Sequence, residues 1–257
     1  MTFAARLRGR ERIAGVWQIT PSPVIAERLA TLGFDYLCLD TQHGLIDYAS
    51  FVAAVTAVDA AGGVAIGRVA ANDPARIGRL LDAGAQGVIV PLVNSAEEAA
   101  AAVSACRYPP AGTRSYGPAR SDLRIGPDPR AADEAVACIV MIETRGALED
   151  IERICRIPGL DGVYIGPSDL ALALGAPRPG ETAGTPEFAQ AFKRITAAAE
   201  SAGIGCGVHC HSADEAARML DDGFTFATAC SDLSLLEEAA RAALRTVTPS
   251  PGAAGPR

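Results

Sequence analysis

Two acidic residues, Glu143 and Asp169, are the residues of this sequence best placed to do chemistry. Glu143 ends the apolar segment 137–143, and Asp169 follows the apolar segment 161–166. Short apolar segments rich in β-branched residues predict buried strands. Two carboxylates just past such strands, one βα unit apart, can converge on one hard divalent cation through their oxygen atoms. The pattern predicts a metal-assisted enzyme, although either residue taken alone could instead cap the helix that follows it.

Histidine and arginine follow other strand-like segments. His43 lies in the polar loop 40–44, and Arg68 lies near the end of the apolar segment 63–69. An imidazole titrates near neutral pH and can move a proton, whereas Arg68 needs an anionic partner from the protein or from a substrate. A 2-oxo acid that meets the cation through its carboxylate and keto oxygens would have its enolate stabilised, with Arg68 holding the developing charge. These residues predict aldol chemistry on pyruvate.

Several other cofactor chemistries are not expected. Lys193 is the single lysine and lies within a predicted helix, so we expect neither an imine-forming aldolase nor a pyridoxal phosphate enzyme. The segment 18–23 after the first strand contains no glycine, so we expect no nucleotide loop there. His209 and His211 form a His-x-His pattern after a later strand, where we expect them at most to line the pocket.

Strand-like and helix-like segments alternate along the whole chain. Eight βα units in about 250 residues predict an α/β fold, a single-domain (β/α)8 TIM barrel over 1–247; an open doubly wound sheet is the alternative. The predicted strands span 13–18, 35–40, 63–69, 86–93, 136–143, 161–166, 204–209 and 224–230, and the predicted helices span 22–32, 48–61, 73–83, 95–106, 146–155, 186–202, 212–222 and 232–245. The connections 107–135 and 170–185 are long, and the tail 248–257 is expected to be disordered.

Composition narrows the class of protein further. The chain has 257 residues, 49% of them hydrophobic, which is enough for a full core. Its formal net charge of −7 and dispersed arginines argue against a nucleic-acid partner. The sequence has no apolar run of membrane-spanning length and no apolar signal core, and its seven irregularly spaced cysteines suit a reducing compartment, so we expect a cytoplasmic protein without a membrane partner.

Several motifs together resemble the HpcH/HpaI aldolase family, the metal-dependent class II pyruvate aldolases. The resemblance runs from about Leu7 to about Leu244. The motifs that carry it lie at 15–17, 40–44, 67–69, 86–91, 108–115, 142–144 and 166–170. The last motif, Gly166-Pro167-Ser168-Asp169-Leu170, is highly specific in combination with the strand that ends in Glu143.

The resemblance implies roles for the candidate catalytic residues. Glu143 and Asp169 would ligate Mg²⁺, Mn²⁺ or Co²⁺, and Arg68 would bind the pyruvate enolate. His43 would serve as acid and base or orient a metal-bound water, and Asp40 would polarise that site. The family aspartate that pairs with the histidine across a subunit boundary is matched by Asp82.

The resemblance also implies substrate contacts and an assembly. The substrate would be a 4-hydroxy-2-oxo acid, such as 4-hydroxy-2-oxoheptanedioate or a 2-keto-3-deoxy sugar acid. Its cleavage products, a small 2-oxo acid (pyruvate) and an aldehyde, would be the small-molecule partners of the protein. Trp17 would wall the site, and the loop of Arg114 would approach the aldehyde. The pyruvate pocket would be lined by Gly166, Pro167 and Ser168. A homo-oligomer is expected, a hexamer in which the last helix is often exchanged between neighbours.

Three departures from the family pattern leave the substrate open. Gln42 stands where some members have Glu, Met141 stands where some have Gln, and 209–211 is His-Cys-His instead of small or apolar residues. Two other functions remain. A CoA-thioester lyase like the citrate lyase β subunit would need a cationic site for the CoA phosphates, and a non-catalytic barrel that binds keto acids would not need an acid/base.

Overall fold

Eight parallel strands close into one barrel in the computed structural model, which describes residues 1–179 and 185–248. Each strand pairs with the next one along the chain, and β1 pairs with β8 to close the sheet. The strands are β1 (Ile13–Gln18), β2 (Tyr36–Asp40), β3 (Ala65–Arg68), β4 (Gly87–Val90), β5 (Ala137–Ile142), β6 (Gly162–Ile165), β7 (Gly205–His209) and β8 (Phe226–Ser231). The predicted TIM barrel is confirmed; the largest difference is that the fourth strand ends at Val90, not at 93.

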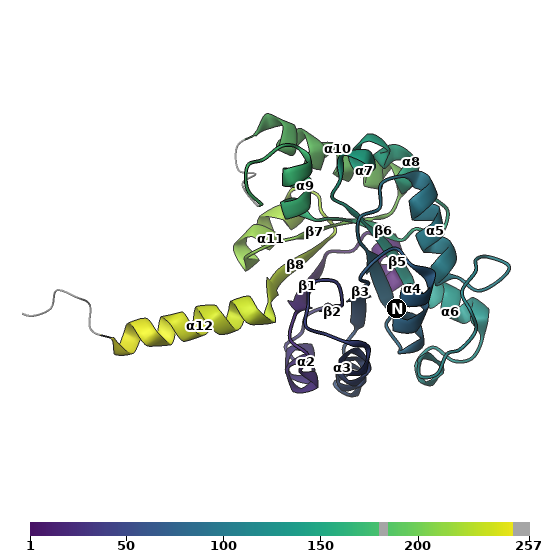
Figure 1. Ribbon diagram of the computed structural model, residues 1–257, viewed down its shortest axis with the longest axis horizontal. Coiled ribbons are helices and arrows are strands. Elements are labelled where there is room, and N and C mark those ends of the chain that lie inside the picture. Colours follow the sequence, from purple (N-terminus) through teal and green to yellow (C-terminus); the bar gives the residue numbers. More distant parts are fainter. Residues whose placement is uncertain (180–184, 249–257) are drawn as a thin grey trace, which may run out of the picture.

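Most of the helices surround the barrel on its outside (Figure 1). They are α2 (Pro23–Ala30), α3 (Tyr48–Ala60), α4 (Pro74–Asp82), α5 (Ala96–Cys106), α6 (Pro129–Ala135), α7 (Arg145–Glu149), α8 (Ile151–Cys155), α9 (Pro167–Ala173), α10 (Pro186–Ala202) and α11 (Ala213–Asp221). Four of the turns that follow helices contain a glycine with positive φ, a conformation that glycine adopts without strain: Gly33, Gly84, Gly203 and Gly223.

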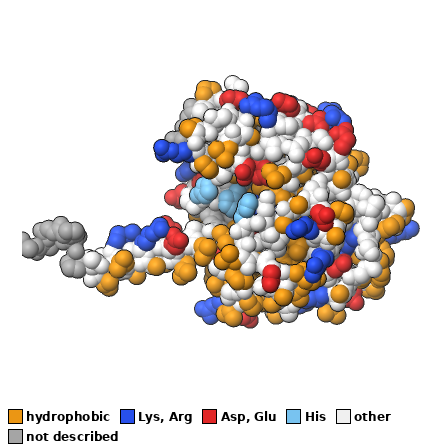
Figure 2. Space-filling model, viewed as in Figure 1, with side chains coloured by type: hydrophobic (Ala, Val, Ile, Leu, Met, Phe, Trp, Pro, Cys, Tyr) orange, Lys and Arg blue, Asp and Glu red, His pale blue; other side chains and the backbone are white. Residues whose placement is uncertain are grey.

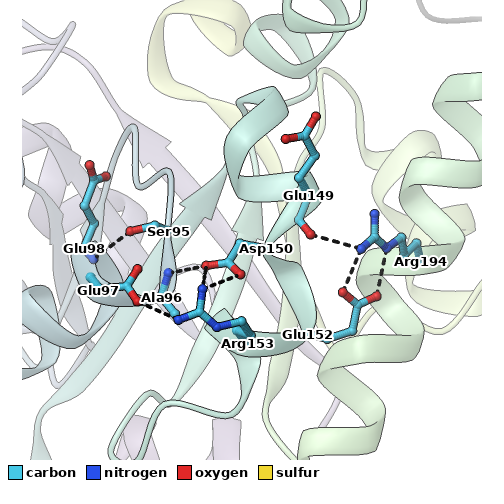
Figure 3. A network of polar contacts seen from close by, with 9 residues as sticks. All are labelled: Ser95, Ala96, Glu97, Glu98, Glu149, Asp150, Glu152, Arg153 and Arg194. Carbon is cyan, nitrogen blue, oxygen red and sulfur yellow. Dashed lines mark hydrogen bonds and ion pairs between the residues drawn. The ribbon is translucent and has the colours of Figure 1, made fainter.

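The chain also forms elements that the sequence pattern did not predict. The predicted helix 146–155 is divided into α7 and α8 at Asp150, whose Oδ2 accepts a hydrogen bond of 2.7 Å from the backbone N–H of Ala96 on α5. Figure 3 shows this contact within a polar network that joins α5, α8 and α10. The helices α6 and α9 and the 3-10 turn η1 (Ser121–Leu123) lie in or beside the two long connections.

Large aromatic side chains fill the inside of the barrel. Tyr36, Tyr164 and Phe226 are fully buried and form one apolar cluster with α1 (Phe3–Arg8), which supplies Phe3 and Leu7. A β-carbon at position 15 would lie 2.1 Å from Cζ of Tyr36, so only glycine fits opposite that ring. The inside of the barrel is therefore a packed core.

The last helix, α12 (Asp232–Val247), projects away from the barrel (Figure 1). Its one buried residue is Asp232, at its first position, and its leucines Leu236 and Leu244 are each 63% exposed. The tail predicted to be disordered lies, from residue 249 on, outside the described residues. Among the described helices, none is long and apolar enough to cross a membrane.

Candidate active site

Polar side chains from most of the strands meet in a pocket of about 350 Å³ at the carboxyl ends of the barrel. In Figure 2 the histidine side chains gather in one hollow on the visible face of the molecule. The pocket is lined by Trp17, Ile19, Asp40, His43, Arg68, Met141, Gly166, Pro167, Ser168, Asp169, His209, His211 and Ser231. A larger, mainly apolar cavity of about 650 Å³ lies between α10 and α11. Its charged lining residues, Lys193, Glu215 and Asp222, lie on or just after these outer helices and not at the ends of strands.

Arg68 and Asp40 form a bidentate ion pair at the edge of this pocket. They end the neighbouring strands β3 and β2 and face each other in the sheet register. Nε of Arg68 donates to Oδ1 of Asp40 at 2.9 Å, and Nη2 donates to Oδ2 at 2.5 Å. The anion that Arg68 was predicted to need is thus supplied by the protein. Among the described residues, Nη1 of Arg68 has no hydrogen-bond partner, so it remains able to bind a substrate oxygen.

Asp40 is held as a carboxylate by its surroundings. Burial alone would raise its pKa, but the hydrogen bonds and charge of Arg68 lower the pKa below its ordinary value. Nε1 of Trp17 donates to Oδ2 at 3.2 Å, and the backbone N–H of Gln42 donates to Oδ1 at 2.9 Å. Asp40 therefore fixes the guanidinium, the indole and the start of the loop that carries His43.

Glu143 and Asp169 lie close enough for their charges to interact. Glu143 follows β5 and is buried, whereas Asp169 lies in the first turn of α9, after β6, and is exposed. Burial raises the pKa of the Glu143 carboxyl, and the charge of Asp169 raises it further. Neither residue caps a helix as its alternative interpretation suggested, because the N-cap residues are Thr144 for α7 and Gly166 for α9.

The surroundings of Glu143 fit an oxygen-liganded cation. Oε1 accepts a hydrogen bond of 2.8 Å from the backbone N–H of Leu92. Gly166 lies beside Oε2: a β-carbon there would be 2.3 Å from that oxygen. The charge of Asp169 helps to raise the pKa of the buried Glu143 carboxyl, so the pair lacks a compensating positive charge. A divalent cation would supply that charge and keep positions open for substrate oxygens. Within residues 1–179 and 185–248, no group of three or more His, Cys, Asp or Glu residues could hold a metal.

The structure places the remaining candidate residues in two locations. Trp17 is buried at the floor of the pocket, where its ring lies 5.0 Å from Cζ of Arg68, and His43 is exposed at the rim. Asp82 and Arg114 do not line the pocket of their own chain. Instead, Nη2 of Arg114 donates to Oδ1 of Asp82 at 2.7 Å.

Two residues near the site were not found from the sequence. Leu92 donates to Glu143 from a backbone with a φ of +55°, a conformation that no sequence signal indicates for leucine. Tyr164 lies below the pocket and contacts Trp17 and His209. The alternation along β6 could have located it, since Tyr164 precedes Gly166 by two residues and therefore points to the same side of the sheet.

A family model of the HpcH/HpaI aldolase/citrate lyase group matches residues 14–239. The chain belongs to this family. A hydroxypyruvate/pyruvate aldolase of Rhizorhabdus wittichii is 42% identical over 234 residues, which cover 91% of this chain and 92% of that protein. A 2-dehydro-3,6-dideoxy-6-sulfogluconate aldolase of Pseudomonas putida is 34% identical over 225 residues, 86% of this chain and 87% of that protein.

Solved structures of HpcH/HpaI family proteins share the barrel. The structure of a family protein from Burkholderia cenocepacia superposes with a TM-score of 0.87 and 32% sequence identity. The match covers 95% of this chain and 98% of the Burkholderia chain. The fold and the family expected from the sequence motifs are thus confirmed.

Proposed function

We propose that this HpcH/HpaI family member is a carbon–carbon lyase, an aldolase that reversibly cleaves a 4-hydroxy-2-oxo acid to pyruvate and an aldehyde. The observation that carries the proposal is the meeting of Asp169, Arg68 and His43 at one pocket. Glu143 is buried directly behind Gly166 of the pocket wall and is close enough to Asp169 for their charges to interact. Two relatives that are named aldolases also support the proposal, because they are 34% and 42% identical to this chain over most of their length.

The cation would be held by Glu143 and Asp169. Mg²⁺, Mn²⁺ and Co²⁺ all suit carboxylate ligands. When bound, such an ion supplies Lewis-acid polarisation of the keto group. The backbone N–H of Leu92 holds Glu143 in place for this purpose, and Gly166 leaves room beside its second oxygen.

The protein groups divide the remaining work of the reaction. His43 takes the proton of the C4 hydroxyl while the C3–C4 bond breaks, and the bonding electrons pass to the enolate of pyruvate. Arg68 donates from Nη1 to the enolate oxygen, with its plane fixed by Asp40. Trp17, Gly166, Pro167 and Ser168 enclose the pyruvate half. His43 then returns that proton to C3 of the enolate, which gives pyruvate and regenerates the neutral imidazole.

We further propose that the protein works as a homo-oligomer, a hexamer. The projecting helix α12, with its exposed leucines, supports contact with a neighbouring copy. Asp82 and Arg114, which lie away from the pocket of their own chain, would then act at the site of a neighbour. There Asp82 would pair with His43, and the loop of Arg114 would approach the aldehyde. The cytoplasmic location stays a prediction from the cysteine content.

The thioester-lyase alternative receives no support from the pocket. Among the described lining residues, Arg68 is the single arginine, and Asp40 engages it. A site for the phosphates of CoA would need further cations nearby.

A coupled assay with lactate dehydrogenase and NADH tests the proposal. The substrates are 4-hydroxy-2-oxoheptanedioate and a 2-keto-3-deoxy sugar acid, each with Mn²⁺ or Mg²⁺ and with EDTA. We expect pyruvate release that EDTA abolishes. Binding of Mn²⁺ and pyruvate without turnover of either substrate would contradict the proposal and favour a binding barrel.

A further inference from the structure

His209 lies in the part of the pocket wall that the pyruvate half does not need. The metal-binding pair follows β5 and β6, and Arg68 ends β3, so these strands receive the carboxylate and keto oxygens under the proposed function. The opposite wall is formed where β7, β8 and β1 end, and it carries Ile19, His209, His211 and Ser231. The aldehyde half of the substrate must therefore extend toward this wall.

The imidazole ring of His209 is held in one place by two aromatic neighbours. The ring of Trp17 meets it edge-on, with the centroids 5.0 Å apart. Oη of Tyr164 lies 3.4 Å from Nδ1, a long and weak hydrogen bond. His211, two residues on, is exposed, with its ring centroid 5.8 Å from that of His209. His209 is thus the ordered imidazole of the two.

A chain of buried hydroxyls below His209 determines which ring nitrogen carries the proton. Tyr36 Oη lies 3.0 Å from Thr228 Oγ1, and Thr228 Oγ1 lies 2.6 Å from Tyr164 Oη. Among the described residues, Thr228 is the partner within hydrogen-bonding distance of the buried Tyr36 hydroxyl, and the Tyr164 hydroxyl is its next, weaker neighbour. Tyr36 must then donate to Thr228, because its proton would otherwise be buried without an acceptor. Thr228 in turn donates to Tyr164, and Tyr164 donates to Nδ1 of His209.

When Nδ1 of a neutral imidazole accepts a hydrogen bond, the single ring proton lies on Nε2. Burial lowers the pKa of His209 to about 4, and His211 and Arg68 lower it in the same direction. The ring is therefore neutral at pH 7. It offers the pocket one N–H donor and no charge.

The geometry points to His209 as the residue that selects the aldehyde, with its Nε2–H donating to a hydroxyl on the carbon next to the aldehyde carbonyl. The inference rests on the proposed function and deepens it: the substrate class becomes hydroxylated aldehydes, not alkyl aldehydes. His209 is partly exposed to the pocket, and a bound substrate would cover its N–H. An alkyl aldehyde would then leave this N–H without an acceptor, and such an unpaired donor discriminates against the analogue. Tyr164 is a positioning residue, since it acts through His209.

The test compares glycolaldehyde with propanal, which replaces the hydroxyl by a methyl group. The kcat/KM for addition of pyruvate to each aldehyde is measured with Mn²⁺, and the ratio of the two values is the readout. Exchange of the pyruvate methyl hydrogens in D₂O, measured without aldehyde, reports enolate formation separately. The variants are His209→Phe, which removes the donor, His209→Gln, which keeps an N–H donor, His211→Phe and Tyr164→Phe.

We expect His209→Phe to lower the glycolaldehyde-to-propanal ratio by about tenfold, the effect of roughly one hydrogen bond. His209→Gln should restore most of the ratio, which a merely structural role would not explain. If His209→Phe does not fold, the isosteric Tyr164→Phe carries the test, and its ratio should also fall. An unchanged ratio in His209→Phe with exchange still present, or a fall confined to His211→Phe, would overturn the inference. Absence of exchange in the unmodified protein would instead reject the proposed aldolase and this inference with it.

Discussion

The backbone N–H of Leu92 donates a hydrogen bond of 2.8 Å to Oε1 of Glu143, and Leu92 makes this contact with a φ of +55°. Non-glycine residues pay roughly 1–2 kcal/mol for this left-handed conformation. The side chain of Leu92 is 52% exposed, so apolar packing does not explain the position. The contact orients the buried carboxylate that we propose as a metal ligand.

Substitutions of Leu92 should show whether Mn²⁺ binding depends on the backbone conformation at this position or on the leucine side chain. Leu92→Gly keeps the N–H and adopts the conformation easily, so Mn²⁺ affinity should stay near that of the unmodified protein. Leu92→Ile, with a β-branched side chain, should destabilise the fold by about 1–2 kcal/mol and weaken Mn²⁺ binding. Isothermal titration with Mn²⁺ and guanidinium unfolding measure both effects. Equal affinities for the two variants would show that the backbone conformation does not hold Glu143.

Removal of the Glu143 charge should abolish stabilisation by metal. A ligand at 100 times its Kd stabilises a folded protein by about 2.7 kcal/mol. Added Mn²⁺ should therefore raise the Tm of the unmodified protein and leave that of Glu143→Gln unchanged. Glu149→Gln, at the end of the neighbouring helix α7, is the matched control and should respond as the unmodified protein does. A normal Mn²⁺ response in Glu143→Gln would place the metal elsewhere.

The Asp40–Arg68 pair should make stability depend on pH. The pKa of Asp40 is lower in the folded protein than its ordinary value of 3.8. Its contribution is therefore present above pH 3.8 and is lost as pH falls through the folded pKa. Asp40→Asn should cost about 3 kcal/mol at pH 7, because it leaves Arg68 without its counter-charge. Urea unfolding of both proteins from pH 7 down to pH 3 measures the difference, which should shrink at the acid end. A difference that stays constant with pH would assign the loss to packing.

A β-carbon at Gly166 should disturb the site more than the fold. It would lie 2.3 Å from Oε2 of Glu143, so Gly166→Ala must displace the carboxylate. We expect a loss of about 1–3 kcal/mol in stability and a marked fall in Mn²⁺ affinity. Gly78→Ala is the control, because its β-carbon would meet nothing within 4 Å on α4 and should stabilise the helix by about 1 kcal/mol. Unaltered Mn²⁺ binding by Gly166→Ala would argue against Glu143 as a ligand.

The exposed leucines of α12 should control assembly. Leu236→Asp combined with Leu244→Asp places charges on the surface that we propose meets a neighbouring copy. Light scattering after size exclusion should show a hexamer for the unmodified protein and smaller species for the double variant. Leu32→Asp, which changes an exposed leucine outside α12, should leave the assembly intact. A monomeric unmodified protein would refute the proposed oligomer.

The sequence by itself determined the barrel and most of the pocket lining. Strand and helix periods depend on local patterns of apolar residues, and the positive-φ glycines mark where several helices end. Parallel strands in a closed barrel bring all their carboxyl ends to one face. Residues that end or follow strands, such as Asp40, Arg68 and Asp169, were therefore located from the order of the chain alone.

Only the tertiary structure decided how these side chains are held. Asp40 and Arg68 pair although they are 28 positions apart in the chain, and Leu92 donates to Glu143 across 51 positions. The hydroxyl chain below His209 joins residues that are 45 or more positions apart. The division of α7 from α8 likewise accompanies a contact from Asp150 to another helix. Such contacts depend on which segments become neighbours in space, and no local pattern of apolar and polar residues contains that information.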